Sequence, residues 1–323
     1  MTSQALNVLL VVASVAFALN MGGANLATAF SGILGARILS KRAVLLLYSF
    51  FVTLGALWLG KFVASTLGSA IVPASAFNTA TTLSVVASAA VSLMACNLLH
   101  IPQSTSMITV FAIATVGVRN GGLNVDTLLY RLLPAWVGLP LLAFLLTWGI
   151  ARLFYPLRGW NFRVYEHLSK HEWKLRALAI VGSCYLSLAV GANNVANVVG
   201  PLATSGAVDP FVGFICMAPV FGLGGWLFGG AATTQSTGIV PIGLFSATIG
   251  NVVVATLVLV VSWLGIPMPA VHVSALSVVA LSRAKEGSVH MMPRALLIKM
   301  VVVWFTSPLV AFGATWGLLE LLE

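Results

Sequence analysis

Ten long apolar stretches, separated by short polar connections, follow one another along this 323-residue chain. Several of them reach the roughly 20 residues that a helix needs to cross the hydrocarbon core of a bilayer, and none shows the alternation of barrel strands. Only 7% of the residues are charged and 59% are hydrophobic, whereas a soluble domain has about 25% charged residues. These features predict an all-α integral membrane protein.

The apolar stretches fall into two sets of five. The first set covers 5–36, 43–67, 80–99, 102–118 and 127–154, and the second covers 175–199, 211–229, 244–265, 267–281 and 295–319. The long polar stretch lies between the sets. An odd number of spans per set turns the second copy upside down. We therefore expect a first membrane repeat over 1–154, a cytoplasmic connecting loop over 155–174 and a second, inverted repeat over 175–323.

The basic residues are distributed unevenly between the loops. Twelve of the sixteen Lys and Arg residues belong to the connections around 37–42, 152–176 and 283–294. Such loops stay cytoplasmic, so both termini of this multi-pass protein should be extracellular or periplasmic, in a plasma or inner membrane. The net charge of +9 then serves orientation and predicts no binding of nucleic acid.

The first apolar stretch is too long for one straight crossing. At about 1.5 Å per residue, residues 5–36 would span roughly 48 Å. We expect this stretch to break or turn back at Asn20, Gly22 and Gly23. The stretches 102–118 and 267–281 are short enough to be re-entrant.

Two related asparagine- and glycine-rich segments lie inside apolar stretches. The segment Asn20-Met-Gly-Gly-Ala-Asn-Leu-Ala-Thr28 and the segment Gly191-Ala-Asn-Asn-Val-Ala-Asn197 align at a constant offset of 169, which pairs Asn25 with Asn194. Polar amides are costly in lipid, and matched copies in two halves are typical of repeat transporters with a site at the midplane. Alternatively, the glycines only allow close helix packing while the asparagines bond across helices.

A second group of polar residues follows a proline. Pro102 precedes Gln103, Ser104, Thr105 and Ser106, and a helix start with several hydroxyls can bind an anion through its N–H and O–H groups. A plain helix cap by Ser104 is the simpler alternative. The stretch 266–272 repeats the Ile-Pro entry and ends in His272. A third hydroxyl-rich stretch, 232–238, either lines a cavity or forms a loop.

These motifs resemble those of a known family. The segment 191–197 resembles the GANDVAN signature of the inorganic phosphate transporter (PiT) family, and 102–106 and 267–272 are similar to its PVSTTH motif. The resemblance implies an inverted-repeat secondary transporter that carries phosphate with sodium or protons, in a family that includes bacterial sulfate permeases. It also suggests site residues. The expected substrate-binding residues are Ser104, Thr105, Ser106, Asn25, Asn194, Asn193 and Gln103, and the expected coupling residues are His272, Asn20 and Asn197.

The chain departs from the family pattern at two charged positions. Asn25 and Asn194 stand where the family has aspartates that help to hold the coupling cation. An amide lacks the charge of a carboxylate, so the affinity for sodium should fall. Phosphate near neutral pH is partly protonated and can donate a hydrogen bond to a carboxylate, whereas sulfate has no proton and is repelled by a carboxylate. Neutral donors therefore favour sulfate. Pro269, Ala270 and Val271 replace the hydroxyls of the second motif, which predicts an asymmetric site.

We therefore expect uptake of sulfate or a related oxyanion coupled to protons, because import of a dianion against about 100 mV costs roughly 4.6 kcal/mol. The alternatives are a phosphate transporter, proton- or sodium-coupled, and, from another class, a passive anion channel. No enzyme activity, cofactor or metal site is expected, since the sequence has no HExxH motif and no paired intramembrane carboxylates. The expected partners are the solute, protons and the lipid bilayer. A homodimer is left open.

Overall fold

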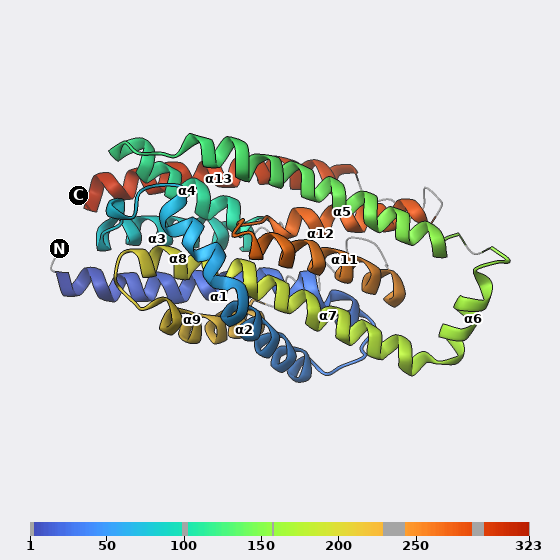
Figure 1. The fold of residues 1–323 in the computed structure, drawn as a ribbon. Coiled ribbons are helices and arrows are strands. Elements are labelled where there is room, and N and C mark those ends of the chain that lie inside the picture. Colours follow the sequence, from blue (N-terminus) through green and yellow to red (C-terminus); the bar gives the residue numbers. More distant parts are fainter. Residues whose placement is uncertain (1–2, 99–102, 157, 229–242, 286–293, 323) are drawn as a thin grey trace.

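The structure is a computed structural model, and it describes residues 3–98, 103–156, 158–228, 243–285 and 294–322. The described residues form a bundle of helices without any strand (Figure 1). The main helices are α1 Ser3–Gly35, α2 Lys41–Ser65, α3 Thr79–Leu98, α4 Thr105–Asn120, α5 Leu133–Phe154, α6 Phe162–Lys170, α7 Glu172–Asn194, α8 Ala196–Thr204, α9 Pro210–Leu227, α11 Leu244–Trp263, α12 Ala270–Ala284 and α13 Arg294–Leu322. Short π- and 3-10-helical turns complete the list: η1 Thr66–Ala70, η2 Ala74–Ala76 and η3 Thr127–Leu132.

Eight helices in the described part are long and apolar enough to cross a membrane. Many of their large hydrophobic side chains point outward, for example Leu141 and Leu145 on α5 and Phe305 and Leu309 on α13. An outward apolar surface of this kind is favourable only in lipid. The prediction of an all-helical, multi-pass membrane protein is confirmed.

Two helical hairpins enter the bundle from opposite ends. Helix α3 packs against α4, and α11 packs against α12. In Figure 1, α3 ends and α4 begins near the middle of the molecule, with their other ends toward the two termini, and α11 and α12 meet near the middle from the opposite end. The predicted stretches 102–118 and 267–281 are the returning arms of these hairpins. The hairpin arrangement is the one expected of re-entrant segments, and their depth in the membrane stays a prediction.

The helix contacts repeat between the two halves. Helix α1 packs against α3 and α9, and α7 packs in the same way against α11 and α2. Likewise α5 packs against α12, and α13 packs against α4. These contacts exchange α1 with α7, α2 with α9 and each hairpin with the other, which is the arrangement of an inverted repeat. The boundaries of the repeats at 154 and 175 stay predictions.

Glycines allow the closest of these contacts. A Cβ atom on Gly22 of α1 would clash with the carbonyl oxygen of Phe221 on α9, and one on Gly191 of α7 would clash with that of Val52 on α2. The reverse contacts follow the same pattern, with Gly224 against the carbonyl of Leu19 and Gly55 against that of Leu188. Both partners of each contact shift by 169 residues, so one interface occurs twice. Only glycine lets the backbones approach this closely.

The expected break in the first apolar stretch is wrong. Helix α1 runs without interruption for 33 residues, and in the second half the helix is interrupted only at Val195, between α7 and α8. The amides of Asn20 and Asn25 donate to carbonyls one turn earlier in α1, at 2.9 and 2.8 Å. The polar groups therefore need no break, and a long helix fits a bilayer by tilting. Asn20, Gly22 and Gly23, where we expected the break, all lie within the continuous helix α1.

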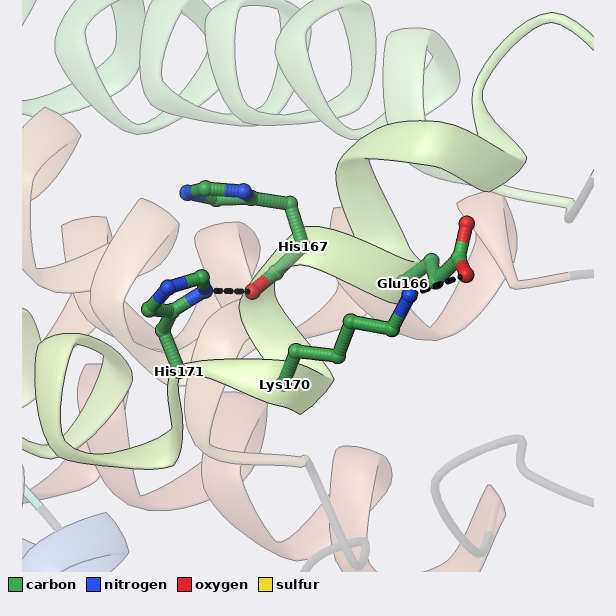
Figure 2. A network of polar contacts seen from close by, with 4 residues as sticks. All are labelled: Glu166, His167, Lys170 and His171. Atoms are coloured by element: carbon green, nitrogen blue, oxygen red, sulfur yellow. Dashed lines mark hydrogen bonds and ion pairs between the residues drawn. The ribbon is translucent and has the colours of Figure 1, made fainter.

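A short helix, α6, lies inside the stretch 155–174, which we expected to be a loop. Figure 1 places α6 at the end of the bundle opposite the termini. Figure 2 shows its polar side: Lys170 donates to Glu166 at 2.7 Å, and the rings of His167 and His171 stack with centroids 4.3 Å apart. Ion pairs and contacts four residues apart help so short a helix to form.

Candidate functional site

The two repeats meet at a pair of asparagines. The side-chain amide of Asn194, the last residue of α7, donates a 2.9 Å hydrogen bond to the side-chain oxygen of Asn25 in α1. Both side chains are buried. Asn25 also donates to the carbonyl of Met21. The residues that the sequence offset pairs are therefore in direct contact.

The surroundings of this pair carry no fixed negative charge. Throughout the described ranges, the buried polar side chains are hydroxyls, amides and the imidazole of His272, without a carboxylate. The side-chain oxygen of Asn194 has no hydrogen-bond partner among the described residues. A buried acceptor without a partner is costly, so it marks a position that a proton donor or a cation would stabilise.

Hydroxyls from the start of α4 lie within reach of α8. The amide of Asn197 donates to Thr105 and Ser106, with donor–acceptor distances of 3.4 and 3.3 Å. Ser106 in turn donates to the carbonyl of Met268, at the turn of the second hairpin. The contact therefore joins α4, α8 and the turn between α11 and α12. The side-chain oxygen of Asn197 is also unpartnered among the described residues.

Ser104 acts as the cap of α4. Its hydroxyl oxygen accepts from the N–H of Met107 at 3.1 Å. The first two N–H groups of a helix have no intrahelical acceptor, and here they belong to the buried residues Thr105 and Ser106. The cap accounts for Ser104, while these N–H groups at the start of α4 are of the kind that can bind an anion.

Gln103 precedes this group and faces the other arm of its hairpin. Its amide donates to the carbonyl of Ser92 on α3 at 3.4 Å. The side-chain oxygens of Gln103, Ser92 and Thr82 are buried and lack partners among the described residues. The first hairpin thus carries several polar atoms that no described protein group satisfies.

Asn193 holds the turn of the second hairpin. Its amide donates to the hydroxyl of Ser262 at 2.9 Å and to the carbonyl of Ile266 at 3.0 Å, and its oxygen accepts from the N–H of Met268 at 2.8 Å. These bonds occupy both of its amide hydrogens and its oxygen. The geometry therefore supports positioning of the turn by Asn193, whereas the sequence predicted a contact with the solute.

Two donors to the same turn had not been predicted. Arg131 of η3 donates to the carbonyl of Leu264 at 2.6 Å, and Trp136 of α5 donates to the carbonyl of Pro267 at 2.8 Å. No local sequence pattern signals these bonds, because donor and acceptor are more than 130 residues apart. Together with Asn193 and Ser106, they give four carbonyls of the turn a donor from another element.

The remaining predicted residues lie around this centre. Asn97 of α3 donates to the side-chain oxygen of Asn20 at 3.4 Å, which ties Asn20 to the first hairpin. His272, near the start of α12, stacks on Trp304 of α13 with ring centroids 3.9 Å apart. Its Nε2 atom is buried without a hydrogen-bond partner among the described residues. Pro102 and the stretch 232–238 lie outside the described residues.

This arrangement is closed and electrically neutral. Asn194 bonds to Asn25, and Asn197 bonds to the hydroxyls of Thr105 and Ser106; all these side chains are buried. In this conformation a solute would have to displace these bonds, so access requires movement of helices or hairpin turns. The available donors and acceptors are amides, hydroxyls and the N–H groups of a helix start.

Comparisons with known proteins identify the family and the fold of this chain. The phosphate transporter family matches residues 21–315. The sulfate permease CysP of Bacillus subtilis (strain 168) is 31% identical over 312 residues, which cover 95% of this chain and 86% of that protein. A solved sodium-dependent phosphate transporter has a similar fold, with a TM-score of 0.86, 20% sequence identity and coverage of 98% of this chain and 99% of that one.

Proposed function

The chain belongs to the phosphate transporter family, and from this premise we propose that it imports sulfate together with protons through the neutral centre around Asn25 and Asn194. Its general class is that of a multi-pass membrane transporter for an inorganic anion. The proposal concerns which anion is carried, which cation drives it and which way the protein faces.

The Asn25–Asn194 hydrogen bond carries the choice of anion. A carboxylate here would repel a full dianion, whereas two neutral amides do not. Sulfate has no proton to share with an acceptor, so its binding depends on donors such as those at the start of α4. The similarity to a sulfate permease supports the same choice.

The same pair argues against sodium. Hard cations prefer oxygen ligands with charge, and the described buried side chains include no carboxylate. Two amide oxygens near the centre, those of Asn194 and Asn197, lack a hydrogen-bond partner among the described residues, but they supply only dipoles. Sodium would thus be held weakly, and sodium coupling is not expected.

Without sodium coupling, protons are the cations that we expect to drive sulfate uptake. Import of a dianion against an inside-negative potential of about 100 mV costs roughly 4.6 kcal/mol, so at least two positive charges must enter with it to cancel the charge. His272 is the one buried histidine or charged-type residue in the described part of the chain, and an imidazole can carry a proton near neutral pH. We assign the proton-linked role to His272.

We propose that both termini face the outside. The basic connections around 37–42 and 152–176 lie at the end of the bundle that holds α6, away from the two termini (Figure 1). Because Lys and Arg accumulate in cytoplasmic loops, this end would face the cytoplasm of a cell bounded by a plasma or inner membrane.

Uptake into proteoliposomes tests the proposal. Labelled sulfate should accumulate when an inward proton gradient is imposed and should not respond to a sodium gradient. An excess of unlabelled phosphate should compete poorly; strong competition would make phosphate the substrate. Flux that follows only the membrane potential and the sulfate gradient would identify a channel instead. A sodium requirement would refute the coupling argument.

A further inference from the structure

Three large aromatic side chains stand exposed around α6. Trp160, Phe162 and Trp173 are 62%, 56% and 68% exposed; the first two belong to the polar connection before α7, and Trp173 lies in the first turn of α7. Exposure of such large apolar rings to water is energetically unfavourable. Tryptophan is favourable at the level of lipid headgroups, where its apolar body and its N–H group both find suitable surroundings.

The same segment has an excess of positive charge. Its two carboxylates are neutralised internally, Glu166 by Lys170 at 2.7 Å and Glu172 by Arg176 at 2.8 Å. Three cations remain, and within the described residues no ion pair involves their side chains: Arg158, Arg163 and Lys174. The ammonium of Lys174 lies 5.7 Å from the centre of the Trp173 ring. The surface therefore combines aromatic rings with unpaired cations.

The position along α7 places this surface near the membrane boundary. Leu178 and Val181 are exposed apolar residues of α7, a helix long and apolar enough to cross a membrane, so we expect lipid chains to cover them. Trp173 precedes Leu178 by five residues, which is about 7.5 Å along a helix axis. The headgroup layer adds roughly 5–7 Å on each side of the hydrocarbon core. Trp173 thus lies at headgroup level.

Glu166 and Lys170 of α6 and the adjoining His171 form their hydrogen bonds and ion pair with one another or with the helix backbone. Figure 2 shows Nδ1 of His171 bonded to the carbonyl of His167, the two rings close together at a tilt, and Lys170 paired with Glu166. The groups left for an external partner are the aromatic rings and the three unpaired cations. Anionic phospholipids offer the complementary chemistry, a negative phosphate next to an apolar layer.

We propose that α6 and its flanks, residues 158–174, form a docking surface for anionic phospholipid headgroups. Arg158, Arg163 and Lys174 bind the phosphates, and Trp160, Phe162 and Trp173 enter the interface. Each cation near an anionic surface strengthens the association about fivefold. The surface ties the connection between the two repeats to the membrane, independently of which solute is transported.

Hydrogen exchange of the full-length protein in lipid nanodiscs tests this proposal. The backbone amides of 158–174 should exchange more slowly in phosphatidylcholine that contains phosphatidylglycerol than in phosphatidylcholine alone. Salt should weaken this protection because it screens the charges. In the variant Arg158→Gln/Arg163→Gln/Lys174→Gln, the bias toward the docked state should fall on the order of a hundredfold, so the lipid dependence should disappear.

A charge-neutral variant provides the control. Glu166→Gln/Lys170→Gln removes an ion pair from the same helix without changing the net charge, and it should keep the response to phosphatidylglycerol. Equal exchange in both lipids for the unmodified protein would overturn the proposal and leave the surface to an acidic soluble partner. Loss of the response in the charge-neutral variant as well would also contradict it, since helix stability would then explain the effect.

Discussion

Asn194 donates its side-chain amide to the side-chain oxygen of Asn25, its counterpart in the other repeat, at 2.9 Å. Two amides can bond in this way, whereas two carboxylates would repel each other in the same place. The central contact between the repeats is therefore made by two uncharged side chains. Substitutions that introduce charge at these positions test why it is neutral.

Asn25→Asp combined with Asn194→Asp should change both the rate and the coupling. We expect sulfate uptake to fall about tenfold or more, because like charges brought together cost several kcal/mol. Any remaining uptake should become dependent on sodium, which the carboxylates can bind. Uptake into proteoliposomes with separate sodium and proton gradients measures both effects. Asn25→Ser with Asn194→Ser, which adds no charge, should acquire no sodium dependence; if it did, the charge would not be the cause.

Thr105→Ala should weaken solute binding without disturbing the fold. A hydrogen bond to a charged group contributes about 1.5–3 kcal/mol, so KM for sulfate should rise about tenfold or more. Thr109→Ala is the matched control, because its hydroxyl donates at 3.0 Å to the carbonyl of Thr105 in its own helix. An equal effect of both variants on KM would show that α4 is merely destabilised.

Removal of Asn193 should loosen the turn of the second hairpin. Asn193→Ala leaves the carbonyl of Ile266 and the N–H of Met268 without their partner, at a cost of about 1–3 kcal/mol for each buried group. We expect a lower temperature of unfolding in detergent and a loss of uptake. The exposed Asn124, whose side-chain oxygen accepts from the N–H of Thr127 at 3.0 Å, serves as a control, and its change to Ala should cost only about 1 kcal/mol. Full uptake by Asn193→Ala would show that the clamp is dispensable.

Gly22→Ala and Gly191→Ala should destabilise the protein to similar extents. Each added Cβ clashes with a backbone carbonyl that cannot rotate away, and such overpacking costs about 1–3 kcal/mol. The change in the temperature of unfolding measures the cost. Gly149→Ala on α5 is the control, because no described atom lies within 4 Å of its Cβ position, and it should be neutral or slightly stabilising. Unchanged stability of Gly22→Ala would mean that α1 and α9 can separate freely.

His272→Gln should uncouple transport from the proton gradient. Glutamine can hydrogen-bond but cannot take up a proton, so sulfate uptake should no longer increase when an inward proton gradient is imposed. Exchange of sulfate for sulfate, which needs no net proton movement, should persist. His167→Gln on the surface of α6 should leave the proton dependence intact. If His272→Gln kept its full response to pH, another group would carry the proton.

The sequence predicted the segments well and their contacts only in part. The stretches 211–229 and 244–265 agree closely with α9 and α11, because Asp209-Pro210 caps the start of α9 and Gly265 follows the end of α11. The offset of 169 also paired Asn25 with Asn194 correctly. A glycine pair in a helix, however, is compatible with a break and with a close contact alike. Only the position of Phe221 on α9 decides between them for Gly22.

The roles of individual amides were harder to predict. Asn193 and Asn194 are neighbours in the chain, but successive residues of a helix point in different directions. Asn194 therefore faces α1, while Asn193 faces the turn after α11. The bonds of Arg131 and Trp136 to that turn depend on the packing of η3 and α5 against the second hairpin, which no pattern in the sequence records.

The doubled glycine contact also has a mechanical consequence. Helices α1 and α9, and likewise α7 and α2, touch backbone to backbone at two points each, so neither pair can slide without losing its fit. We expect these four helices to form a stationary frame during the transport cycle. Motion would then be left to the groups on its two sides, α3, α4 and α13 on one and α5, α11 and α12 on the other, which pack among themselves.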